Sequence, residues 1–163
     1  MGEDQKYITL GDEEVFDKFA DTVYRLAFSR VKSKHDADDI LGEVFLRYVK
    51  AEHKFLSEEH IKFWLIRTTI NCSKSFFTSS WFKKIVPLDD TLYTSLKEHS
   101  SVYYAVMELP IKYRTAIHLY YYEEYSVKEI ADILEISQSA VKSRLARARE
   151  QLKTKLEGVT FDV

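Results

Sequence analysis

The chain has 163 residues, of which 45% are hydrophobic and 14% aromatic, and its net charge is −2. This composition excludes a wholly disordered protein, and the length suits one ordinary domain or two small ones. Four Gly and two Pro are too few for the many turns of an all-β fold, so the composition predicts a mostly helical protein.

Cysteine and histidine usage gives no support for a metal site or a cofactor. Cys72 is the only cysteine, which excludes an intrachain disulfide and a Cys-rich metal site. No two of the five histidines are four residues apart, the spacing that places two ligands on one helix face. The first residues are polar and acidic, and no segment approaches the roughly 20 apolar residues of a membrane span. A cytoplasmic protein without membrane insertion is expected.

Three amphipathic helices are expected in the first half of the chain. The first begins at Asp12, and apolar residues from Val15 to Ala27, including Phe16, recur at helical spacing. In the second, Asp36 is expected to cap the helix, and an apolar stripe follows from Ile40 to Val49. The third begins near Ser57. Its expected core contacts are Phe63, Trp64, Ile66, Ile70 and Phe77.

The second half is expected to contain a linker and then a helix-turn-helix. Pro110 suits the first position of a helix, and Ser126 with Glu129 has the spacing of a capping box that begins the next one. The chain then turns at Glu135, which must adopt the left-handed conformation if this turn is kept. This order is typical of a helix-turn-helix, whose second helix enters the major groove of DNA.

Positive charge is concentrated in two segments of this slightly acidic chain. Residues 61–84 contain five Lys or Arg and no Asp or Glu. Residues 137–155 contain six Lys or Arg against the single acid Glu150. Two basic segments separated by acidic sequence indicate contact with a polyanion at two places.

The last helix has side chains suited to reading DNA. If Ser137 caps it, its first turns carry polar and basic residues that can bond to base edges, where Gln pairs with adenine and Arg with guanine. Residues further along suit phosphates, which position a protein without specifying sequence. The expected base-reading residues are Gln138, Ser139, Lys142, Ser143 and Arg144, and those expected at phosphates are Arg147, Arg149 and Lys153.

Three stretches in this order resemble the extracytoplasmic-function (ECF) group of bacterial RNA polymerase sigma factors. "DADDILGEVFLRYVK" and "FWLIRTTINCSKSFF" are similar to successive parts of sigma region 2. "ELPIKYRTAIHLYYYEEYSVKEIADILEISQSAVKSRLARAREQL" resembles region 4. The resemblance implies an all-α protein of two small helical domains: region 2 at residues 1–84, a linker at 85–104 and the region 4 helix-turn-helix at 105–163.

The resemblance also implies partners and site residues. Core RNA polymerase is expected to bind through the coiled coil of its β′ clamp and through its β flap, and promoter DNA at the −10 and −35 elements. An anti-sigma factor is a further implied partner. The implied clamp-binding residues are Asp38, Asp39, Leu41, Glu43, Phe45, Leu46 and Arg47. The implied region 2 contacts to DNA are Asn71, Lys74, Ser75, Trp81, Lys83 and Lys84.

Two other classes of function remain open from the sequence. One is a stand-alone helix-turn-helix regulator, with residues 1–100 as a sensor or dimerisation domain. The other is an enzyme that uses the adjacent carboxylates Asp38 and Asp39, or Glu123 and Glu124, as acid and base. Adjacent helical residues diverge by about 100°, so neither pair converges on a substrate. The sequence therefore favours a protein without catalytic activity.

Overall fold

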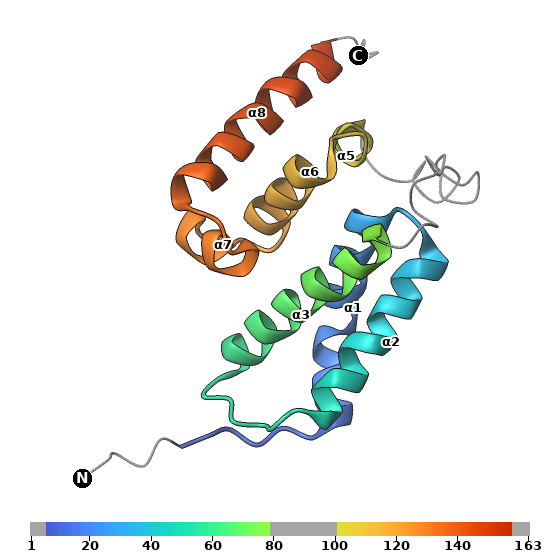
Figure 1. Cartoon of the computed structure of the whole chain (residues 1–163), viewed down its shortest axis with the longest axis vertical. Coiled ribbons are helices and arrows are strands. Elements are labelled where there is room, and N and C mark those ends of the chain that lie inside the picture. Colours follow the sequence, from blue (N-terminus) through green and yellow to red (C-terminus); the bar gives the residue numbers. More distant parts are fainter. Residues whose placement is uncertain (1–5, 79–100, 158–163) are drawn as a thin grey trace. The chain divides into compact units, whose positions relative to one another are not determined.

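The computed structural model describes residues 6–78 and 101–157, and every regular element in these two ranges is helical (Figure 1). The chain divides into two compact units, residues 1–84 and residues 85–163. The predicted all-α fold class is confirmed. Most of the predicted linker lies outside the described residues.

The first unit is a bundle of three helices that pack against one another (Figure 1). These are α1 (Asp12–Val31), α2 (Lys34–Lys50) and α3 (Glu58–Thr78). Each contributes one apolar stripe to a shared core, and removal of these side chains from water is the main force that stabilises the bundle. The fully buried core side chains include Val23, Leu26, Ile40, Val44, Ile66 and Ile70.

Two expectations about this bundle are wrong in detail. Ser33, rather than Asp36, caps α2, because its side-chain oxygen accepts the Asp36 N–H at 3.2 Å. Asp36 instead lies in the first turn, where its carboxylate faces the positive end of the helix dipole. The predicted apolar stripes also include side chains that the three-helix bundle leaves exposed to solvent. Phe16, Val49 and Phe77 are 43%, 53% and 36% exposed.

A buried arginine joins the C-terminal ends of α1 and α3. Arg30 is only 8% exposed, and its Nε donates a hydrogen bond to the Ser73 hydroxyl. Burial lowers the pKa of Arg30 to about 10, so the guanidinium stays charged at neutral pH. Loss of a partner from a buried charge is costly, so this bond helps to fix the end of α3 against α1.

The second unit contains α5 (Ser101–Met107), α6 (Ile111–Ile117), the π-helical turn η2 (His118–Tyr122), α7 (Val127–Leu134) and α8 (Gln138–Glu157). Pro110 was expected as the first residue of this helix, but it is the residue before α6. Arg114 is buried and donates to the Leu109 carbonyl at 2.7 Å, which closes the turn between α5 and α6. α5, α6 and α7 each pack against α8, so α8 is held along much of its length.

The predicted capping box begins α7. The Ser126 hydroxyl accepts the Glu129 N–H at 3.1 Å, and the Glu129 carboxylate accepts the Ser126 N–H at 3.0 Å. Two backbone donors at the helix end, which no helical carbonyl can reach, are satisfied in this way. This sequence prediction is confirmed.

Gly42→Ala is expected to stabilise the first unit by about 0.5–1 kcal/mol, because an interior Gly costs a helix that much relative to Ala. Gly42 is exposed on α2, and an added Cβ meets no atom within 4 Å. Chemical denaturation measures the change. The matched control is Gly11→Ala, also in open space but before the first turn of α1, where Ala gives no such gain. Equal effects at both glycines contradict this explanation.

Ser126→Ala is expected to destabilise the second unit by about 1 kcal/mol, because it removes the oxygen that accepts the Glu129 N–H. Ser139→Ala is the control, since this serine is exposed in the first turn of α8. Thermal unfolding of both variants tests the difference. A Ser126 variant as stable as the parent contradicts a stabilising role for the capping box.

Candidate nucleic-acid interface

The turn between α7 and α8 has the geometry that the sequence predicts for a helix-turn-helix. Glu135 adopts the left-handed conformation with φ 56° and ψ 45°. Its N–H donates to the Ala131 carbonyl, as does the N–H of Ile136 at 3.1 Å. The Ser137 hydroxyl then accepts the Ala140 N–H at 3.0 Å and caps α8. These bonds end α7, turn the chain over residues 135–137 and begin α8.

One buried stripe determines which face of α8 is presented to solvent. Val141, Leu145 and Ala148 are at most 2% exposed and lie at helical spacing. The expected base-reading residues at the start of the helix lie away from this stripe. Four of them, Gln138, Ser139, Lys142 and Ser143, are exposed, and the fifth, Arg144, is half-buried.

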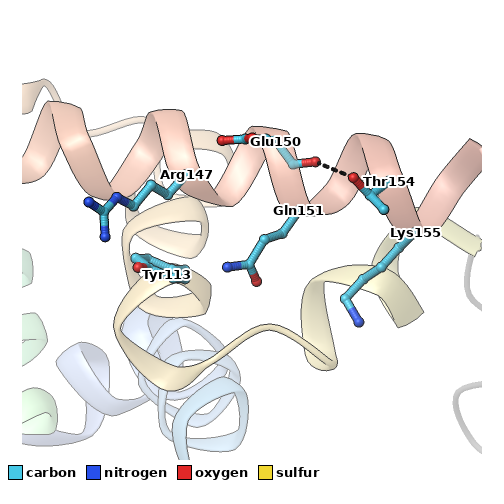
Figure 2. A pocket seen from close by; sticks show the side chains of 6 residues that line it. All are labelled: Tyr113, Arg147, Glu150, Gln151, Thr154 and Lys155. Atoms are coloured by element: carbon cyan, nitrogen blue, oxygen red, sulfur yellow. Dashed lines mark hydrogen bonds between the residues drawn. The ribbon is translucent and has the colours of Figure 1, made fainter.

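Arg147, which lies further along α8, contacts a tyrosine of α6. Figure 2 shows its guanidinium beside the Tyr113 ring, at one end of a hollow that Gln151, Thr154 and Lys155 also line. The pKa of the Tyr113 phenol is lowered, chiefly by the adjacent Arg147 guanidinium and further by nearby Lys112. At the other end of the hollow, Lys155 pairs with Glu108 at 3.2 Å.

Arg149 contacts two tyrosines of the η2 turn. Its Nε donates to the Tyr121 hydroxyl at 2.8 Å, and its guanidinium carbon lies 5.7 Å from the ring centres of both Tyr120 and Tyr121. Sequence reasoning noted the tyrosine run but did not pair it with this arginine. Of that run, Tyr125 is buried, Tyr120 is half-buried, and Tyr121 and Tyr122 are about half exposed, at 51% and 47%.

On α3, the three expected DNA-contacting residues are all exposed. Asn71, Lys74 and Ser75 are three and four residues apart and so share one face of the helix. Between them, Cys72 and Ser73 are buried in the bundle. Burial raises the pKa of the Cys72 thiol, so this cysteine is a core residue that resists ionisation. The other expected contacts, Trp81, Lys83 and Lys84, lie outside the described residues.

On α2, most of the expected polymerase-binding residues are exposed. Glu43 accepts a hydrogen bond from Arg47 at 2.9 Å, and Leu46 is 49% exposed. Phe45 differs from the expectation of a surface contact: it is 7% exposed, and its ring packs edge-on against Phe16 at 4.9 Å. It therefore supports the surface from below. Asp38 and Asp39 are exposed, and Leu41 is half-buried.

Within residues 6–78 and 101–157, no group of three or more His, Cys, Asp or Glu side chains could hold a metal ion. Over the same part of the chain, no helix is long and apolar enough to cross a membrane.

Each of the two units matches a known family model. Residues 15–82 match the family model for sigma-70 region 2, and residues 99–152 match the model for sigma-70, region 4. The region 2 match occupies the part of the chain where a stand-alone regulator needs a sensor or dimerisation domain. It therefore favours a sigma factor over that alternative. Sigma factors are transcription initiation factors rather than enzymes.

Individual relatives agree with this assignment. The ECF RNA polymerase sigma factor SigM of Bacillus subtilis is 34% identical over 155 residues, covering 86% of this chain and 92% of that protein. SigW of the same organism is 28% identical and covers 93% and 94%.

Solved structures agree on the fold. RpoE, in complex with the anti-sigma factor NepR from Bartonella quintana, has a TM-score of 0.65 at 17% identity, covering 90% of this chain and 96% of that one. CnrH, in complex with the cytosolic domain of CnrY, has a TM-score of 0.66 at 20% identity, covering 91% and 89%. The two regional matches and the identity to SigM together show that the chain belongs to the ECF group of the sigma-70 family of RNA polymerase sigma factors.

Proposed function

We propose that the two units divide the work of promoter recognition between them. In this proposal α2 binds core RNA polymerase, α3 contacts the −10 element and α8 contacts the −35 element. The observation that carries the proposal for α8 is its buried stripe of Val141, Leu145 and Ala148, which leaves the polar start of the helix in solvent after a helix-turn-helix turn. Membership of the sigma factor family indicates the process in which these surfaces act, which is transcription initiation by RNA polymerase.

At the −35 element, the start of α8 reads base edges. Arg144 can make two hydrogen bonds to a guanine and Gln138 two to an adenine, each worth about 1–3 kcal/mol of discrimination against a wrong base. Lys142 and the hydroxyls of Ser139 and Ser143 complete this exposed surface. Arg147 and Arg149, further along, contact the sugar-phosphate backbone.

At the −10 element, Asn71, Lys74 and Ser75 contact the strand that separates from the duplex. Opening the duplex costs a few kcal/mol per unstacked base, and aromatic platforms with neighbouring cations recover about 1–3 kcal/mol for each base captured. Trp81, with Lys83 and Lys84, has this chemistry directly after α3 in the sequence. We assign these three residues to the displaced strand.

Core polymerase binds the acidic and apolar surface of α2. Exposed Leu46 and Val49 are one helical turn apart and share a face of α2 with the carboxylates of Asp39 and Glu43. Adjoining apolar side chains rimmed by polar ones mark protein-binding surfaces. Region 4 is proposed to bind the polymerase β flap. An anti-sigma factor is a further proposed partner, because the solved relatives RpoE and CnrH are named as complexes with NepR and CnrY. The proposed place of action is the cytoplasm.

Arg144→Ala is expected to weaken transcription from promoters selected by their −35 element by about tenfold, because it removes one bidentate contact to a base. Asn71→Ala is expected to leave −35 selection intact and to impair recognition near the start site. Genome-wide run-off transcription with reconstituted holoenzyme measures both effects and also returns the recognised sequences. If both variants transcribe the parent's promoters at the parent's strength, the assignment of these residues is wrong.

Leu46→Glu is expected to weaken binding to core polymerase by tenfold or more, because it places a charge in the centre of a desolvated contact. Binding is measured without DNA, by fluorescence anisotropy of the labelled chain. Leu56→Glu is the matched control: Leu56 is 47% exposed against 49% for Leu46, but it lies outside α2. A loss of affinity that is equal in the two variants contradicts the assignment of α2.

A further inference from the structure

Two arginines of the DNA-facing helix each lie beside a tyrosine of the preceding elements. Arg149 is held most closely, because it donates to the Tyr121 hydroxyl at 2.8 Å and lies over the rings of Tyr120 and Tyr121. The two rings also contact each other edge to face at 4.9 Å. Arg147 contacts Tyr113 of α6 (Figure 2).

The two arginines project from opposite flanks of α8. They are two residues apart, and a helix turns by about 100° per residue, so their side chains leave the axis about 160° apart. Their tyrosine neighbours differ accordingly, since Tyr113 lies in the first turn of α6 and Tyr121 near the end of η2. α6 and α7 both pack against α8, and η2 packs against α6 and α7, so the tyrosines, the two arginines and the base-reading face belong to one packed unit.

A helix with opposed cations matches the shape of the DNA major groove. The groove is about 12 Å wide, and a helix with its side chains is about 10–12 Å across, so the two flanks of an inserted helix face the two phosphate backbones. A guanidinium has five N–H donors. Tyr121 takes the one on Nε of Arg149, and the four on the Nη atoms remain suited to a phosphate.

The tyrosines reduce the entropy lost on binding. A free arginine side chain samples many rotamers, and part of this conformational entropy is lost when it binds a phosphate. A side chain that is already held in the free protein loses less, which favours binding. Tyr121 contributes a second donor as well, because its hydroxyl oxygen accepts from Arg149 while its own hydrogen can be donated to the same phosphate.

We propose that Tyr113 and Tyr121 are positioning residues that hold Arg147 and Arg149 on opposite flanks of α8, so that each arginine binds the phosphate backbone of a different DNA strand. This inference rests on the proposed function of α8 at the −35 element. It adds that the contacts are divided between strands and that the Tyr121 hydroxyl takes part.

Phosphate ethylation interference, read separately on each strand, tests the division. The probe is a promoter fragment recovered by the run-off experiment, bound by reconstituted holoenzyme. Arg147→Ala is expected to remove interference at phosphates of one strand, and Arg149→Ala at phosphates of the other. If the two arginines only stabilise the fold, both variants weaken promoter binding, but neither loses interference on one strand in particular. Lys155→Ala is the matched control, because it removes a positive charge from the same helix at a residue paired with Glu108.

Tyr121→Phe tests the positioning role, because it keeps the ring and removes the hydroxyl. It is expected to weaken promoter binding about threefold to tenfold, the range for loss of one hydrogen bond. In this variant, ethylation interference is expected to decrease on the strand that Arg149 contacts and to stay unchanged on the other strand. Arg149→Lys keeps the charge but cannot reproduce the bond from Nε, so it is expected to keep the salt dependence of binding and to lose affinity.

Three results overturn the inference. The first is loss of interference on the same strand in both arginine variants, and the second is an unchanged pattern in both. The third is a Tyr121→Phe variant that binds like the parent. A parent holoenzyme that forms no promoter complex at all is a different failure, because it overturns the proposed function of α8 itself.

Discussion

The burial of a single apolar stripe on each helix is the constraint on which the rest of this structure depends. Val141, Leu145 and Ala148 fix the rotation of α8 about its own axis, because any other rotation exposes apolar surface and buries charge. The direction of every polar residue of that helix then follows from the helical period alone. The same holds for α3, where burial of Ile70 and Ser73 leaves Asn71 and Lys74 on the surface.

The parts of this fold that could be predicted from the sequence are those that local chemistry determines. The Ser126–Glu129 capping box, the Ser137 cap and the left-handed Glu135 each depend on bonds within a few residues, and all three are present as predicted. The same reasoning predicted the wrong cap for α2. Ser33 and Asp36 both suit the start of a helix, and only the path of the chain after α1 decides which of them is the cap.

Features that depend on contacts between distant segments could not be predicted. The periodicity of α1 and α2 does not say how much of each stripe the other helices cover, so Phe16 and Val49 were expected in the core although both are exposed. Phe45, to which the resemblance gives a polymerase contact, is buried as part of its stripe. Likewise, no pattern pairs Tyr121 with Arg149, which is 28 residues away. The roles of individual DNA-binding residues also stay predictions, because exposure allows a contact without specifying the base or phosphate.

The two surfaces proposed to bind DNA, on α3 and on α8, have few charges each. A region 4 surface with five or six cations gains much of its affinity from released counterions, and that gain falls steeply with salt. Neither α3 nor α8 is expected to select a promoter alone at physiological ionic strength. In the proposed function, core polymerase supplies the missing selectivity, because it holds both surfaces on one DNA molecule and makes the second contact effectively intramolecular.

The most direct measurement is the affinity of the chain for one promoter fragment, with and without core RNA polymerase, at physiological salt. The account predicts weak and sequence-independent binding by the chain alone and tight, sequence-specific binding by the holoenzyme. Tight, specific binding of the duplex by the chain alone, unchanged when polymerase is added, would contradict it.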